Sequence, residues 1–204
     1  MPFDLSNMPA RVAALPRDRR GLPIPAIVMR DGEGVPHFTM NDTRTALRLQ
    51  REGRCSICSE RLGALKCFVG GPGSAFHPQG RYFDGPVHRD CAIFALHACP
   101  YLAMAGQYAR RISLESMKKK VAVPDGGVLI AEDPTVHAPQ PPAFVLASCR
   151  RYHMEGPHYV PERPWAEVRF FRGGQEITSA EARALTEADP TPPCPFSELK
   201  WQDR

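Results

Sequence analysis

Two short motifs place cysteine and histidine at a spacing that metal sites use. Cys55 and Cys58 are separated by two residues, and so are His88 and Cys91. Two ligands at this spacing reach one ion because a tight turn, or the first turn of a helix, points both side chains the same way. Thiolates and imidazoles are the ligands that Zn²⁺ prefers. The pattern therefore predicts a zinc site made of three cysteines and one histidine.

A Cys3His set fills all four positions of tetrahedral zinc and leaves none for a substrate water. We therefore expect a structural zinc ion that stabilises the fold and performs no catalysis. In the alternative interpretation, Cys55 and Cys58 are incidental buried thiols and His88 only begins a helix. The paired spacing favours zinc.

The other cysteines are weaker candidates for the site. Cys67 replaces a ligand only if the strand that carries it bends back. Cys99 lies eight residues beyond Cys91, which is about 12 Å along a helix, so the two cannot share an ion unless that helix breaks. Together with Cys149 and Cys194, they are predicted to be small apolar side chains.

The elements that position the ligands follow from the surrounding pattern. Residues 41–43 offer N-cap oxygens to a helix that runs to about Glu52, and Gly53 follows where a helix tends to stop. Residues 64–69 have the composition of a strand, and a helix is expected from His88 to about Cys99. The turn that carries Cys55 and Cys58 is called the knuckle. A knuckle, a strand and a helix whose first turn carries two ligands together resemble a treble-clef zinc finger.

Further strands and a helix are predicted on both sides of the zinc motifs. Residues 24–40 are typical of a β-hairpin. Residues 143–149 and 165–171 have strand patterns, and Thr178 and Glu181 have the spacing of a capping box before a final helix. The chain is thus predicted to be an α+β protein with an N-terminal β-hairpin and helix, a treble-clef-like zinc finger and a C-terminal short β-unit with a helix.

Four segments of the chain resemble a family of uncharacterised proteins from bacteria and their phages; they read GLPIPAIVMRDGEGVPHFTMND, RCSICSERLG, PVHRDCAIFALHACPYL and WAEVRFFRGGQEITSAEARAL. The resemblance covers roughly residues 20–190. It implies that Cys55, Cys58, His88 and Cys91 act together and that the C-terminal strands belong with the finger in one protein. It implies no activity. The loop from Gly71 to Phe83 departs from the family pattern.

Proline divides the chain, since 22 prolines in 204 residues are about twice the usual share. They gather between the apolar runs and indicate short elements joined by stiff loops. We expect a flexible tail over 1–20, the hairpin and zinc finger over 21–104, a basic segment and Pro-rich linker over 105–142, the C-terminal strands and helix over 143–190, and a Pro-rich tail over 191–204.

The charge balance permits an anionic partner without requiring one. Lys and Arg number 26 against 22 Asp and Glu, a net charge of +4. The basic stretch from Ala105 to Lys120 could contact phosphates. The alternative, which is favoured, is that its charges form a solvated helix face with no ligand. The candidate nucleic-acid-binding residues of this stretch are Arg110, Arg111, Lys118, Lys119 and Lys120.

The location predicted from composition is the cytoplasm. No apolar run approaches the length of about 18 residues that a membrane span needs, and the N-terminus lacks a secretory signal, so no membrane partner is expected. The seven cysteines are irregularly spaced and do not indicate a secreted disulfide framework.

The preferred function is a zinc-stabilised binding module whose partner is a nucleic acid or a nucleoprotein. One alternative is a metal-dependent nuclease of the His-metal-finger kind, for which His77, Asp84, Asp90 and His97 are the available candidates. Their spacing matches no nuclease signature. Another alternative is a protein-protein adaptor, which is favoured if the basic stretch is buried.

Overall fold

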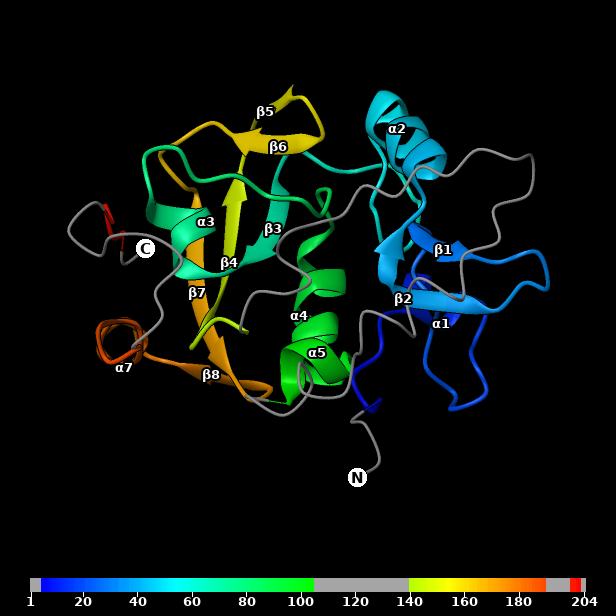
Figure 1. Cartoon of the computed structure of the whole chain (residues 1–204), viewed down its shortest axis with the longest axis horizontal. Helices are drawn as coiled ribbons and strands as arrows, with labels where there is room; N and C mark the ends of the chain where they lie inside the picture. The colour runs from blue at the N-terminus through cyan, green and yellow to red at the C-terminus, as the bar shows by residue number, and fades with distance from the viewer. Residues whose placement is uncertain (1–4, 105–139, 190–198, 203–204) are drawn as a thin grey trace.

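The computed structural model describes residues 5–104, 140–189 and 199–202 of the chain, which form an α+β architecture (Figure 1). In chain order the elements are α1 (Ala10–Ala13), β1 (Val28–Arg30), β2 (Pro36–Asn41), α2 (Thr43–Glu52), β3 (Lys66–Gly70), α3 (Pro72–Phe76), α4 (Arg89–Ala98), α5 (Pro100–Ala103), β4 (Phe144–Cys149), β5 (Tyr152–Glu155), β6 (His158–Pro161), β7 (Glu167–Arg172), β8 (Gln175–Ile177) and α7 (Ser179–Glu187).

The centre of the fold is an antiparallel sheet with strand order β3-β4-β7-β8. All six residues of β4 are buried, because the strand is paired on both edges and covered on both faces. β3 comes from the predicted zinc-finger segment and pairs with β4 along five residues. The C-terminal strands therefore share one sheet with the finger region.

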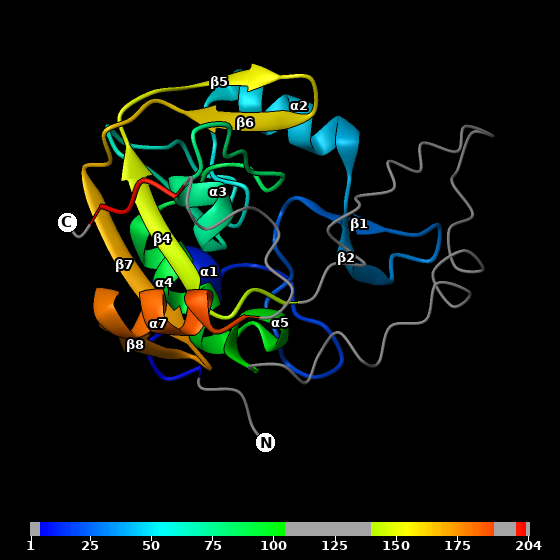
Figure 2. The same cartoon turned by 60° about the vertical axis from the view of Figure 1, so that its left-hand side comes forward.

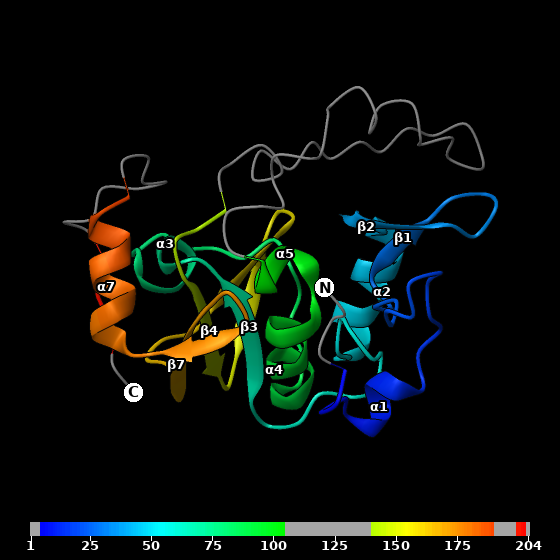
Figure 3. The same ribbon diagram turned by 90° about the horizontal axis from the view of Figure 1, so that it is seen from below.

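Side chains that alternate along the strands give the sheet a core on each face. Leu146 and Phe171 pack under α4 on one face, while Val145 and Phe170 pack against α3 and α7 on the other. Viewed along the sheet, α4 lies on one side and α3 and α7 on the opposite side (Figure 3). The predicted metal ligands belong to the core on the α4 side.

Two predicted helices agree closely with the structure. Helix α2 begins after Asp42, whose carboxylate accepts a hydrogen bond from the backbone N–H of Thr45, and ends at Gly53 in the left-handed conformation with φ 63°. Helix α7 begins with the predicted capping box, in which Thr178 and Glu181 each accept a hydrogen bond from the other's backbone N–H. The predicted N-terminal hairpin is present as β1 and β2.

Other parts of the fold differ from the sequence-based expectation. The Pro- and Gly-rich loop after β3 contains the short helix α3, with Pro72 in its first turn. Strands β5 and β6 form a further hairpin beside the end of the central sheet (Figure 2), and β6 is tied to that loop by paired backbone hydrogen bonds between Tyr82 and Tyr159. Within the segment expected as a flexible tail, α1 packs on the core through Val12, which is 1% exposed.

In the described part of the chain, no helix combines the length and the apolar character that crossing a membrane requires.

Candidate metal centre

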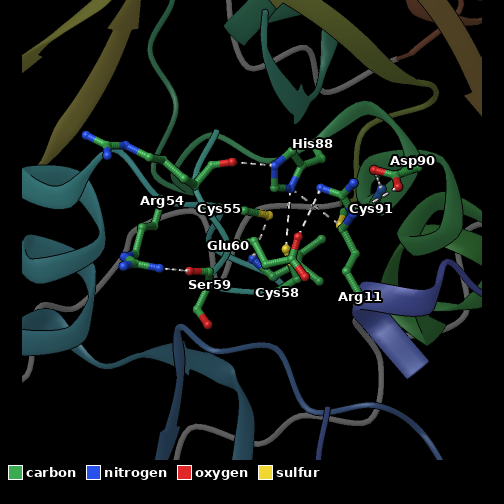
Figure 4. A network of polar contacts seen from close by, with 11 residues as sticks. Arg11, Arg54, Cys55, Cys58, Ser59, Glu60, His88, Asp90 and Cys91 are labelled. Atoms are coloured by element: carbon green, nitrogen blue, oxygen red, sulfur yellow. Dashed lines mark hydrogen bonds and ion pairs between the residues drawn. The ribbon is translucent and has the colours of Figure 1, made fainter. Parts of the chain in front are cut away.

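The structure brings the two predicted ligand pairs together. One ligand atom each from Cys55, Cys58, His88 and Cys91 lies within 4.8 Å of the others, and this is the one group of three or more such side chains among the described residues. The three cysteines are buried, with exposures of 0%, 5% and 0%. Figure 4 shows the side chains converging from the turn after α2 and from the start of α4.

A tight turn after α2 forms the first half of the site. The backbone N–H of Cys55 donates to the carbonyl of Glu60, and that of Ser59 donates to the carbonyl of Cys55, both at 2.9 Å. Ser59 adopts a positive φ of 60°, which closes the turn. The N–H of Ile57 points at the Cys55 sulfur at 3.4 Å. These contacts hold both sulfurs of the knuckle on one side.

A short backbone pairing brings the second half of the site next to the first. Cys67 in β3 and Val87 exchange two backbone hydrogen bonds of 3.0 and 2.9 Å, which places His88 at the N-cap of α4. Cys91 then lies one turn into the helix, on the same face as His88. Knuckle, β-pairing and helix follow in the order predicted for a treble clef, and residues 68–86 form a long insertion in its hairpin.

His88 is oriented as a metal ligand. Its Nδ1 lies 3.3 Å from the Cys58 sulfur and 4.0 Å from the Cys91 sulfur, and its Nε2 lies 3.0 Å from the carbonyl oxygen of Arg61. A carbonyl only accepts, so Nε2 carries the proton and the lone pair of Nδ1 faces the sulfurs. Metal-binding histidines usually fix their tautomer through such an outer hydrogen bond.

The cysteines share protons in a way that produces thiolate. Hydrogen bonds from the thiols of Cys58 and Cys91 lower the pKa of Cys55 well below its ordinary value. The same contact with the Cys55 thiolate raises the pKa of Cys91 well above its ordinary value, and Cys58 and burial add to this. A cluster that stabilises a thiolate at neutral pH suits a divalent cation, because the thiolate is the form that binds metal.

A positive charge lies over the cluster. Arg11 of α1 contacts Asp90 at 3.2 Å and Glu60 at 3.5 Å. Partial burial opposes its charge, but these carboxylates and the sulfurs of Cys58 and Cys91 outweigh that effect and raise the pKa of Arg11. Zn²⁺ with three thiolates has a net charge of −1, so a guanidinium at this position offsets the excess charge. Arg11 also bridges the knuckle and the first turn of α4.

The remaining described cysteines lie outside the cluster. Cys67 is in the middle of the β3 pairing, and burial raises its pKa to about 12. Burial also raises the pKa of Cys149 to about 11 and that of Cys99. Cys67 and Cys149 are buried, in agreement with the small apolar role that was predicted, whereas Cys99 is only partly buried. Cys194 lies outside the described residues.

The candidate nuclease residues do not assemble into a second site. Asp84 accepts a hydrogen bond from Asn41 at 2.8 Å, Asp90 pairs with Arg11, and His97 contacts the carbonyl of Gly174. His77 Nδ1 accepts the N–H of Gln79 at 3.1 Å. Within residues 5–104, 140–189 and 199–202, none of the four belongs to a metal-ligand group of three or more.

The basic stretch predicted to contact nucleic acid is not part of the described structure. Arg110, Arg111, Lys118, Lys119 and Lys120 all fall in the range 105–139. Their role stays a prediction from sequence.

The residues around the ligands were not predicted from sequence. Arg11 lies 44 residues before Cys55, and no local pattern marks it as a neighbour of the site. The Arg61 carbonyl is a backbone group, which has no signature in residue type. Glu60 and Asp90 were detectable only as acids next to ligands.

Comparisons with models of protein families, with curated proteins and with solved structures found no match for this chain. The meaning of the site therefore rests on its own geometry.

Proposed function

We propose that the protein is a zinc-stabilised binding module in which Cys55, Cys58, His88 and Cys91 hold one structural Zn²⁺. The observation that supports this most strongly is the orientation of His88, whose Nδ1 faces the cysteine sulfurs while its Nε2 donates to Arg61. Three sulfurs and one imidazole favour tetrahedral Zn²⁺ over the harder ions that prefer oxygen.

A structural role agrees with the position of the site in the fold. The ligands come in two pairs, one from the knuckle and one from α4. When bound, the ion would link the N-terminal elements to the helix that covers the central sheet. The binding free energy of structural zinc, about 10–16 kcal/mol, is as large as the whole stability of a typical domain. Four protein ligands also leave no coordination position for a catalytic water.

The proposed partner is a nucleic acid or a nucleoprotein, and the proposed compartment is the cytoplasm, where cysteines stay reduced and free to bind metal. The net charge of +4 is compatible with an anionic partner. Binding through phosphate contacts releases counterions from the nucleic acid. Because this release becomes less favourable as the salt concentration rises, the affinity falls steeply with salt.

The test is a binding titration of the full-length, zinc-loaded protein with labelled duplex DNA, single-stranded DNA and RNA, at salt concentrations from about 50 to 200 mM. We expect binding to at least one of these probes, with a steep loss of affinity as salt increases. Zinc-loaded, folded protein that binds none of them at the lowest salt would contradict a nucleic-acid partner and favour the adaptor function. Cleavage of the probe on addition of Mg²⁺ or Mn²⁺ would instead favour the nuclease.

A further inference from the structure

We infer that helix α2 is the element that contacts the nucleic acid. A row of arginines on this helix binds the phosphate backbone. This inference rests on the proposed function and assigns the binding surface to residues that the sequence analysis did not select. The arginine row is defined as Arg44, Arg48 and Arg51.

The arginine row occupies the solvent face of α2. The helix buries Leu49, which is 1% exposed, against the fold. Arg44, Arg48 and Arg51 are all exposed, and their spacing of four and three residues places them on the opposite side of the helix, in one line. At a rise of about 1.5 Å per residue the row is about 10 Å long. Figures 1 and 2 show α2 at the outside of the molecule.

Most of this positive charge is not neutralised by other residues in the described part of the chain. Arg44 and Arg51 make no ion pair within the described residues. Arg48 lies 3.9 Å from Glu52, but that carboxylate is held more closely by Arg54 at 2.6 Å. Some arginines elsewhere in the fold have close acidic partners, such as Arg89 with Glu167 at 2.7 Å and Arg169 with Glu176 at 2.5 Å. The other arginines that lack an ion pair within the described residues are spread over separate elements rather than aligned on one helix face.

The first part of the row opposes the stability of the helix that carries it, whereas Arg51 lies in the last turn, where a positive charge is favourable. Like charges three and four residues apart repel each other on a helix surface. Arg44 lies in the first turn, which contains no acidic residue, and a positive charge there opposes the helix dipole. Positions where a sequence departs from such local rules are typical of functional sites. A bound anion would relieve the repulsion.

Backbone contacts at both ends hold this helix in a defined orientation next to the candidate metal centre. Asp42 caps its start, and its backbone N–H donates to Ile27 at 2.8 Å. At the other end Gly53 closes the helix, accepts the N–H of Leu62 at 2.9 Å, and leads within two residues to Cys55. Metal binding would therefore present the arginine row on a rigid support.

The charge distribution fits a nucleic acid better than an acidic peptide. A linear row of guanidinium groups matches a polymer with phosphates at regular intervals, and each guanidinium can bind a phosphate through two hydrogen bonds. Arg61, which follows the knuckle, is exposed and has no ion pair in the part of the chain that the structure describes, so it adds a further positive charge to the same segment of chain. Leu47, 52% exposed on the same face, offers an apolar contact to sugars or bases.

The experiment compares two triple variants of the full-length, zinc-loaded protein. The first is Arg44→Gln, Arg48→Gln and Arg51→Gln, since glutamine keeps a helix propensity close to that of arginine. The matched control is Arg19→Gln, Arg150→Gln and Arg172→Gln, which removes the same charge from exposed arginines without an ion pair among the described residues. Zinc content and far-UV circular dichroism verify that both are folded. Affinity for labelled duplex DNA and single-stranded RNA is measured by anisotropy against salt.

We expect the α2 variant to lose at least about tenfold in affinity and to show a salt slope shallower by about 2 to 3, because each lost phosphate contact removes close to one unit. The control should change the slope by less than about one. If the triple variant does not fold, Arg51→Gln alone should still reduce the slope by about one.

Equal slopes for the α2 variant and the control, with the wild type binding normally, would overturn this inference and leave the proposed function intact. A zinc-loaded wild type that binds no nucleic acid would overturn the inference together with the proposed partner. Polyglutamate that competes as well as nucleic acid at equal charge would also contradict it, since an acidic protein would then fit the row equally well.

Discussion

His88 has both ring nitrogens accounted for, and this determines what the cluster can bind. The donor at Nε2 is used by the Arg61 carbonyl, and the acceptor at Nδ1 faces the sulfurs. A histidine that only caps a helix would need neither contact. The geometry therefore favours the zinc interpretation over incidental buried thiols.

Loss of one ligand should remove the metal. We expect Cys58→Ser to reduce bound zinc from about one per chain to near zero and to abolish cooperative unfolding. The reason is that the free energy of zinc binding is about as large as the free energy of unfolding of a typical domain. Cys99→Ala is the matched control, since Cys99 lies outside the cluster. It should retain the zinc. Equal zinc contents in the two variants would contradict the ligand assignment.

Zinc affinity should fall as the pH falls. With no metal bound, the Cys55 thiolate raises the pKa of Cys91, so this thiol keeps its proton at neutral pH and zinc must displace it. Acid favours the protonated form, and affinity should drop about tenfold per pH unit for each proton displaced. Competition with a chromophoric chelator between about pH 7.5 and 6 measures this. An affinity independent of pH would argue against thiolate ligation.

At the scale of elements, sequence patterns predicted structure where local chemistry decides it. Gly53 in the left-handed conformation and the capping box at Thr178 are local devices, and both helices have the expected ends. Helix α3 was missed because five residues rich in Gly and Pro are typical of a loop. The β5-β6 hairpin was missed because each strand is only four residues long and part of its stabilisation comes from Tyr82, a distant contact.

Helix α1 shows more clearly that local sequence pattern does not predict packing that depends on distant contacts. Val12 is the one fully buried residue of that short helix, too little apolar character to predict docking. Arg11 then contacts carboxylates far along the chain, and neither partner could be found from spacing. The four ligands, by contrast, were predicted because each pair is local.

Arg11 should stabilise the loaded metal centre. We expect Arg11→Ala to weaken zinc binding by about tenfold, the usual effect of removing an outer-shell partner, since the negatively charged loaded site would lose a guanidinium that interacts with the sulfurs of Cys58 and Cys91. Arg11→Lys should recover part of the affinity. The change in thermal stability should be small, because partly exposed ion pairs contribute about 0.2–1 kcal/mol.

The control is Arg19→Ala, an exposed arginine with no ion pair among the described residues. Chelator competition should give it the same zinc affinity as the wild type. An Arg11→Ala protein within about twofold of that value would show that Arg11 does not act on the metal.

The cap of α7 provides a separate test of the fold. Thr178→Ala removes the hydrogen bond that Thr178 Oγ1 accepts from the Glu181 N–H at 3.2 Å and should lower the free energy of unfolding by about 1 kcal/mol. Thr178→Ser keeps the acceptor and should lose much less. Urea denaturation measures both, and equal midpoints would exclude the cap as a source of stability.

At the level of the described fold, the candidate metal centre lies where the N-terminal elements meet the helix-covered sheet. The cluster is part of the core that also contains Leu146 and Phe171 of the central strands, so loss of the ion would expose a buried face of the fold. The sequence predicted the α+β class and the ligand pairs. It did not predict that β3 completes the C-terminal sheet, because strand pairing across some 80 residues is determined by tertiary packing rather than by local pattern.

The role of the metal is tested by the zinc content of protein purified without added metal, measured by plasma mass spectrometry alongside thermal unfolding before and after chelation. The protein should contain about one zinc per chain and should lose its cooperative transition when a strong chelator removes the metal. Folded protein that contains no zinc, or that melts unchanged after the metal is removed, would contradict a structural zinc site.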